Sequence, residues 1–235
     1  MSVGSEAKGW FTVARTLKIE WAPGEKVTGR LSMPGAGHNT EVGVLLAHGA
    51  GAGQDHPFMV QAREGLAAAG FPTLTFNYAY TEAGRRAPDR APRLLAVHEA
   101  AAHRLAQYCG RVVLAGKSMG GRVGSHLAGD IGWPAAAMVY LGYPLVPMGK
   151  GEPRPTDHLQ RVVAPQLFVT GTRDRLSPPT LIESLAASLP DAAVIVVPDG
   201  DHSFKVLKRT GRTSEEVLDE IIAEVAAWLL PFVRG

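Results

Sequence analysis

The stretch VVLAGKSMGGRVG, residues 112–124, contains two overlapping patterns that could carry chemistry. Gly-Lys-Ser ends a phosphate-binding loop, whereas Gly-x-Ser-x-Gly surrounds a nucleophilic serine, here Ser118. A phosphate-binding loop also needs a glycine at position 111, where this chain has Arg111. Such a loop must expose backbone N–H groups, whereas residues 111–115, RVVLA, are typical of a buried strand, which uses these groups in its own hydrogen bonds. Spacing and context therefore favour a nucleophile placed between a strand and a helix.

A serine hydroxyl is a weak nucleophile at neutral pH and needs a general base that a carboxylate holds in place. Two apolar runs later in the chain, LFVTG and VIVVP, are followed closely by Asp174 and His202. The order serine, aspartate, histidine is found where these groups follow successive strands of one sheet. We therefore expect Ser118 as the nucleophile, His202 as the base and Asp174 as the orienting acid.

Three other side chains remain open for the same roles. His158 lies in an irregular connection and is the one serious alternative base. Asp199 and Asp201 precede His202 and compete with Asp174 as the orienting acid, although a turn suits both of them better.

The negative charge of a tetrahedral intermediate needs backbone N–H donors. We expect one from Met119, directly after the nucleophile, and one from Ala50 in the loop HGAGAG, with Gly51 as the next candidate. This loop does not fit the dinucleotide-binding pattern Gly-x-Gly-x-x-Gly, because Gln54 and His56 stand where the last glycine would be. We interpret it as a tight turn that exposes N–H groups.

Charged and aromatic residues could set specificity. Four basic residues could gather near the mouth of the site and attract a carboxylate or phosphate of the substrate. The alternative is that they are solvated surface charges. They are Lys117, Arg122, Arg85 and Arg86. Three tyrosines could line an aromatic pocket, and ordinary packing is an equal interpretation: Tyr78, Tyr80 and Tyr143. Met119 is expected to form part of a pocket wall because it follows the nucleophile.

The rest of the chain supplies the elements that would position these residues. Two β-rich runs, FTVARTLKIEW and KVTGRLSMP, are joined by a Pro-Gly turn and are expected to pair as antiparallel strands. Short apolar strands then alternate with helical stretches at 56–69, 92–108, 119–129, 179–189 and 214–230, which predicts a mostly parallel sheet. The connection 143–164 carries four prolines and is expected to lie over or beside the site. It is too short for a cap domain.

Composition limits the class of protein. The 235 residues are 46% hydrophobic and 20% charged, with a net charge of +2 and no basic tract, so we expect neither a nucleic acid nor a membrane as partner. Cys109 is the only cysteine, which excludes an internal disulfide and a cysteine-based zinc site. No metal or cofactor is implied.

The N-terminus lacks the apolar segment of a signal peptide. We expect one domain over residues 1–235, cytoplasmic, and a monomer or homodimer.

Seven segments between Ala47 and Phe204 together resemble the α/β-hydrolase superfamily. They are AHGAG, FNYAYTEAGRRAPD, GKSMGGR, GYPL, DHL, LFVTGTRD and DHSF. More narrowly, they are similar to a branch of small, capless, intracellular predicted hydrolases that are described as dienelactone-hydrolase-like. The resemblance implies an eight-stranded core and supports Ser118, Asp174 and His202 as a catalytic triad. Dienelactone hydrolases use a cysteine nucleophile, so their substrate is not implied. Part of this branch is similar to a subunit of eukaryotic histone-acetyltransferase complexes, where the role is assembly.

These observations predict a serine hydrolase that cleaves carboxylic esters or thioesters of small or medium size through an acyl-enzyme. Two alternatives remain open. A hydrolase-fold scaffold would bind a partner with little catalysis, and an acyltransferase or perhydrolase would use the same triad with another acceptor.

Overall fold

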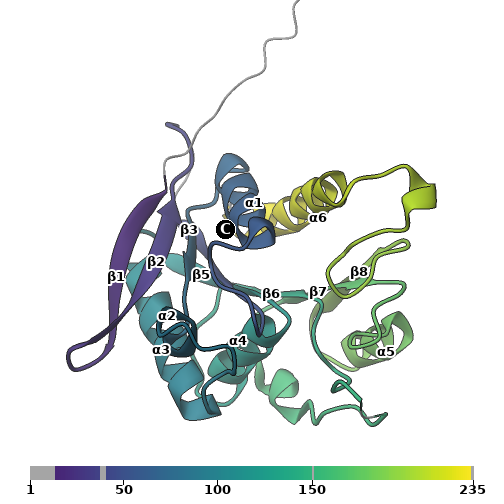
Figure 1. Cartoon of the computed structure of the whole chain (residues 1–235), viewed down its shortest axis with the longest axis horizontal. Coiled ribbons are helices and arrows are strands. Elements are labelled where there is room, and N and C mark those ends of the chain that lie inside the picture. The colour runs from purple at the N-terminus through teal and green to yellow at the C-terminus, as the bar shows by residue number, and fades with distance from the viewer. Residues whose placement is uncertain (1–13, 38–40, 150, 234–235) are drawn as a thin grey trace, which may run out of the picture.

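A computed structural model describes residues 14–37, 41–149 and 151–233 of the chain (Figure 1). The beginning of the first expected strand, residues 11–13, lies outside the described residues. The strands are β1 Arg15–Ala22, β2 Glu25–Ser32, β3 Val42–Ala47, β4 Thr73–Phe76, β5 Arg111–Lys117, β6 Met138–Leu141, β7 Gln166–Gly171 and β8 Ala192–Val197. The α-helices are α1 Pro57–Ala68, α2 Ala79–Glu82, α3 Ala91–Ala106, α4 Met119–Gly129, α5 Pro179–Ala187 and α6 Ser214–Leu229.

The strands form one eight-stranded sheet in the order β1-β2-β4-β3-β5-β6-β7-β8. β2 pairs antiparallel with β1 and with β4, and every pair from β4 through β8 is parallel. Within the described residues, the connection from β6 to β7 contains only a short 3₁₀ turn, Asp157–Arg161, and no cap domain. The structure therefore confirms the expected doubly wound, capless α/β-hydrolase fold with antiparallel N-terminal strands.

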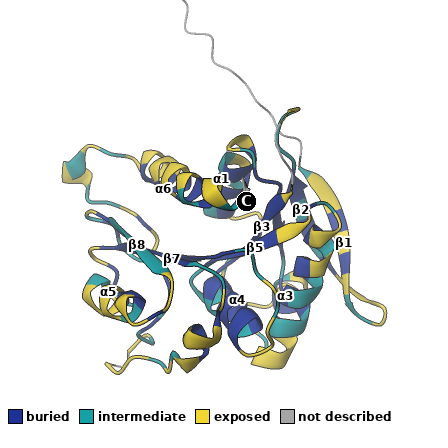
Figure 2. Cartoon of the chain, turned by 180° about the vertical axis from the view of Figure 1, so that it is seen from behind, coloured by how far each residue is buried: buried dark blue, intermediate teal, exposed yellow. Residues whose placement is uncertain are grey.

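Helices cover both faces of the sheet, with α1 and α6 on one face and α3, α4 and α5 on the other (Figure 1). Successive side chains of a strand point to opposite faces, so each central strand contributes to two cores. In β3, Val42, Val44 and Leu46 pack with α1 and α6, while Leu45 and Ala47 pack on the opposite face. Figure 2 shows the resulting layers, with a buried sheet between helices whose outer sides are exposed.

Sequence signals at the helix ends agree with the structure to within about two residues. Pro57 begins α1, where its missing N–H costs nothing, and the His56 side chain accepts a hydrogen bond from the Phe58 N–H. Thr213 and Glu216 form a capping box at the start of α6. The short helix α2 was not expected from the sequence.

Parallel strands end at a common edge of the sheet, and this edge collects the loops that follow them. β3 ends at Ala47, β5 at Lys117, β7 at Gly171 and β8 at Val197. The residues that the sequence singles out follow these four strand ends, so the topology brings them together. Among the helices of the described residues, none is long and apolar enough to cross a bilayer.

Candidate active site

Ser118 occupies a strained turn between β5 and α4. Its φ of 50° and ψ of −115° lie where residues with a side chain rarely occur. Two glycines make the turn possible, because the turn brings backbone segments so close together that no side chain fits between them. A Cβ added to Gly116 would lie 2.2 Å from the Gly121 nitrogen, and one added to Gly120 would lie 2.4 Å from the Ala47 oxygen. The glycines of the sequence pattern are therefore steric requirements of the elbow.

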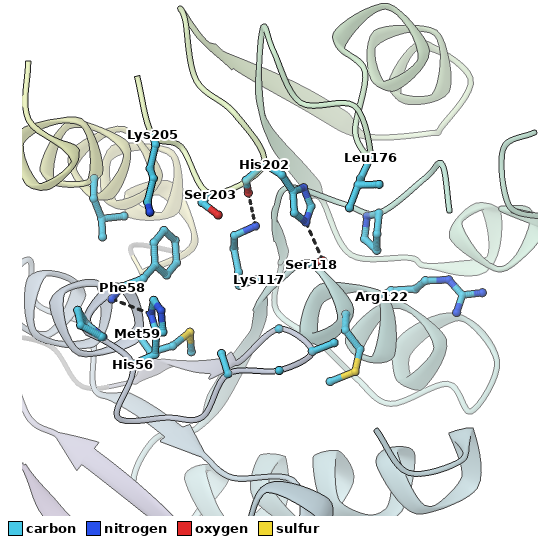
Figure 3. Close-up of a pocket in the computed structure, with 18 of the residues that line it drawn as sticks. His56, Phe58, Met59, Lys117, Ser118, Arg122, Leu176, His202, Ser203 and Lys205 are labelled. Carbon is cyan, nitrogen blue, oxygen red and sulfur yellow. Dashed lines mark hydrogen bonds between the residues drawn. The ribbon is translucent and has the colours of Figure 1, made fainter. Parts of the chain in front are cut away.

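A continuous hydrogen-bonded chain joins the serine to a buried carboxylate, and Figure 3 shows its first link, between Ser118 and His202. The His202 Nε2 lies 2.9 Å from the Ser118 Oγ, and the His202 Nδ1 lies 2.8 Å from the Asp174 Oδ2. The other oxygen of Asp174 accepts hydrogen bonds from the backbone N–H groups of Leu176 and Ser177, at 2.9 and 3.0 Å. With its Nδ1–H donated to the carboxylate, the imidazole leaves Nε2 free to accept the serine proton.

The alternative base, His158, faces another part of the molecule. Its Nε2 lies 2.9 Å from the Ser125 Oγ and 3.3 Å from the Tyr143 hydroxyl, and its ring stacks on His126. Burial lowers the pKa of His158 to about 4. These contacts give it a packing role behind α4.

The alternative orienting acids have local partners as well. Asp199 pairs with Arg209 at 3.1 Å. The carboxylate of Asp201 accepts hydrogen bonds from the Ser203 and Lys205 N–H groups, at 2.8 and 2.9 Å. Both aspartates shape the turn after β8, as their sequence context suggested.

The Lys117 amine is buried beside this chain. It donates a hydrogen bond to the His202 carbonyl and lies 5.3 Å from the centre of the Phe204 ring. Burial lowers the pKa of Lys117 to about 8, and the nearby Asp174 and Asp201 act in the opposite direction. The residue as a whole is half-buried and lines a cavity above Ser118. Its role toward an anionic substrate stays a prediction.

A cavity of about 930 Å³ opens above Ser118. Expected site residues that line it are Ser118, His202, Met119, Ala50, Gly51, Lys117 and Arg122. Apolar side chains make up much of its wall, among them Phe58, Met59, Val146, Met148, Leu176 and Leu218. Figure 3 shows Phe58, Met59 and Leu176 around the serine and histidine.

The loop after β3 runs close to the serine. A Cβ added to Gly49 would lie 3.6 Å from the Ser118 Cβ, so the backbone of Gly49 and Ala50 passes beside the nucleophile. Gly51 adopts a φ of 75°, which turns the chain away again. Met119 is the first residue of α4, where backbone N–H groups have no partner within the helix.

The tyrosines expected in an aromatic pocket are packed in the core. Tyr78 is 0% exposed and Tyr143 1% exposed, and neither lines the cavity. The Tyr78 hydroxyl lies 2.9 Å from the His98 Nδ1, and Tyr143 contacts His158. Tyr80 is also buried. The alternative interpretation, ordinary packing, holds for all three.

Two expected cations lie outside the cavity, and two unexpected ones line it. Arg85 pairs with Asp89 at 2.6 Å, and the exposed Arg86 does not reach the lining. Arg154 and Lys205 line the cavity although the sequence analysis did not name them. The only signal for Arg154 was its place in the proline-rich connection. For the chain as described, no cluster of His, Cys, Asp or Glu could hold a metal ion.

The fold and this elbow define an α/β protein with a serine at the nucleophile position. A family model described as alpha/beta hydrolase domain matches residues 40–230. The chain therefore belongs to the alpha/beta hydrolase family, and this membership supports a hydrolytic enzyme.

Solved structures from three organisms share the fold. Est1E from Butyrivibrio proteoclasticus, with ferulic acid bound, is 15% identical over 93% of this chain and 100% of its own, with a TM-score of 0.75. Dienelactone hydrolase from Anabaena variabilis is 22% identical over 92% and 96%, with a TM-score of 0.73. A serine hydrolase without lid from Xanthomonas campestris is 15% identical over 96% and 95%, with a TM-score of 0.66.

Proposed function

We propose that the protein is a serine hydrolase that cleaves carboxylic ester or thioester bonds through an acyl-enzyme. The observation that carries the proposal is the chain of hydrogen bonds from Ser118 through His202 to Asp174, at the base of an open cavity. This arrangement supplies the nucleophile, the base and the orienting acid that acyl transfer needs.

In the proposed reaction, the Ser118 Oγ attacks the carbonyl carbon while the His202 Nε2 takes the hydroxyl proton. The bond to the leaving oxygen or sulfur then breaks, and His202 returns the proton to the leaving group. Water attacks the acyl-serine in the same way, with His202 as the base, and releases the acid and free Ser118. Asp174 holds the imidazole in the useful tautomer and stabilises its positive charge.

The N–H groups of Met119 and Ala50 are proposed to bind the oxyanion. Both residues line the cavity, and the backbone next to Ala50 passes close to Ser118. One such donor contributes roughly 3 kcal/mol to the stability of the transition state.

The cavity favours substrates of small or medium size. Its volume of about 930 Å³ and its largely apolar wall suit an acyl or aryl group more than a polymer. Est1E, whose structure holds ferulic acid, shows that a protein of this fold accommodates an aromatic acid. Transfer to an added alcohol or to peroxide would use the same groups, and competition of these acceptors with water would reveal it.

A fluorophosphonate probe tests the proposal directly, because it reacts only with an activated serine. We expect labelling at Ser118, mapped by mass spectrometry, and its loss in Ser118→Ala and His202→Ala. Ser214→Ala is the matched control, because Ser214 lines the same cavity without touching the hydrogen-bonded chain. Hydrolysis of an ester should fall by a factor on the order of 10⁶ in Ser118→Ala. A folded wild-type protein that is not labelled would refute the proposal and favour a scaffold role.

A further inference from the structure

Two arginines that no part of the proposed reaction uses line one end of the cavity. Arg122 lies on α4 four residues after Ser118, about 6 Å further along the helix axis. Arg154 comes from the connection between β6 and β7, where its N–H donates a 2.8 Å hydrogen bond to the Leu145 carbonyl. Figure 3 shows Arg122 on the opposite side of Ser118 from Phe58. The two guanidinium groups thus come from distant parts of the sequence.

Neither guanidinium has an acidic partner within the described residues, where no carboxylate lies at ion-pair distance from Arg122 or Arg154. The Nε of each is shielded from solvent and has no hydrogen-bond partner. Burial lowers the pKa of Arg154, and the charge of Arg122 adds to this effect. Burial raises the pKa of the Tyr143 hydroxyl, both charges act to lower it, and Arg122 also lies within hydrogen-bond reach of that hydroxyl. Both guanidinium groups therefore lie near Tyr143.

The charges around the cavity are unbalanced. Its charged lining residues are Arg122, Arg154 and Lys205, against Glu215, while the amine of Lys117, which also lines the cavity, is bound to the His202 carbonyl. Like charges held together in a partly desolvated site repel, and an anion between them relieves that repulsion. Arginine is suited to this task because its planar fork donates two parallel hydrogen bonds to a carboxylate.

Apolar side chains line the cavity next to the segment that carries Arg154. Val146 and Leu176, joined by a backbone hydrogen bond of 2.9 Å, both line the cavity and lie beside the segment that carries Arg154. A short methylene chain would fit such a wall, with a reactive carbonyl at one end and a charged group at the other.

We propose that Arg122 and Arg154 form a carboxylate-binding subsite, and that the substrate is an ester or thioester whose acyl part ends in a carboxylate, as in a monoester of a short dicarboxylic acid. This proposal rests on the proposed function for its reaction. The subsite itself is a binding site and can be tested without turnover.

Kinetics with two isosteric esters provides the first test. Monoethyl glutarate carries the carboxylate, and ethyl glutaramate replaces it with a neutral amide of the same shape. We expect kcat/KM, followed by ethanol release, to be at least about tenfold higher for the anionic ester. Arg122→Gln and Arg154→Gln should each reduce the ratio of kcat/KM for the anionic ester to that for the neutral ester, and the double variant should abolish the preference. Arg86→Gln is the control, because Arg86 is exposed and outside the cavity.

Binding to an inactive variant provides the second test. Titration calorimetry of Ser118→Ala with monoethyl glutarate should show binding that Arg154→Gln weakens at least about tenfold and Arg86→Gln does not. Arginine-dependent binding without turnover in the active protein would uphold the subsite and refute the proposed function. Turnover without preference for the anionic ester, or binding that is equal in all variants, would overturn the subsite. Arg122→Lys keeps the positive charge but loses the planar guanidinium group that donates two parallel hydrogen bonds. This variant should retain part of the preference for the anionic ester.

Discussion

Replacing Lys117 with Met gives a stability difference whose pH dependence follows from the structure. Burial lowers the pKa of Lys117 from 10.5 to about 8, so the folded protein holds this proton more weakly than the unfolded chain does. One pKa unit corresponds to 1.36 kcal/mol, so the charged lysine destabilises the fold by at most about 3 kcal/mol. A methionine of similar length carries no such charge.

The sign of the effect fixes the pH window. Above pH 10.5 the lysine is neutral in both states, and no penalty exists. As the pH falls from 10.5 to 8, the unfolded chain binds a proton that the native state resists, and stability is lost. Below pH 8 the loss is complete. Lys117→Met also leaves the His202 carbonyl without its donor, which costs about 1–3 kcal/mol at every pH.

Urea unfolding measures the difference. Four tryptophans report the transition by fluorescence, and wild type and Lys117→Met are compared at steps between about pH 7 and 10. We expect wild type to gain about 2–3 kcal/mol relative to the variant across this range. Lys26→Met, an exposed lysine of β2, is the control and should show no comparable gain. A difference between wild type and Lys117→Met that stays constant with pH would refute the reasoning.

Two further substitutions test the positions around the site and the helix start. Gly142→Ala adds a Cβ at a φ of 69°, 3.1 Å from the Lys117 Nζ and 3.3 Å from the His202 Cε1, so it should lower both the Tm and kcat with little change in KM. Full ester hydrolysis in that variant would contradict the steric argument. Thr213→Ala removes the capping box of α6 and should reduce the free energy of unfolding by about 1 kcal/mol in urea titrations, with activity unchanged. An unchanged midpoint would show that the cap does not hold this helix.

The topology and the meeting of three side chains could be predicted because periodicity and chain order determine them. Apolar strands that alternate with helices imply a parallel sheet, and a parallel sheet gathers its strand ends at one edge. Ser118, Asp174 and His202 each follow such an end, and the structure places them within hydrogen-bond distance. Their catalytic role stays a prediction, which the fluorophosphonate experiment addresses.

Side-chain direction outside the regular elements could not be predicted in the same way. Tyr78 and Tyr143 follow strand ends just as the triad residues do, yet both point into the core. Their buried partners, His98 and His158, come from other segments that the local pattern does not reveal. Arg154 reaches the cavity from a connection without periodicity, so its position depends on tertiary contacts alone.

Several unfavourable features of the molecule lie at one edge of its sheet. Ser118 has a strained backbone, the Lys117 amine is buried with a lowered pKa, and the like charges of Arg122 and Arg154 act on one another. Buried polar groups also occur elsewhere, among them Arg63 and the His98 Nε2, which has no hydrogen-bond partner among the described residues. The strained backbone of Ser118 is the feature that a nucleophilic role would explain. For this reason we expect the hydrolase rather than the scaffold. A well-folded protein that a fluorophosphonate does not label at Ser118 would overturn that expectation.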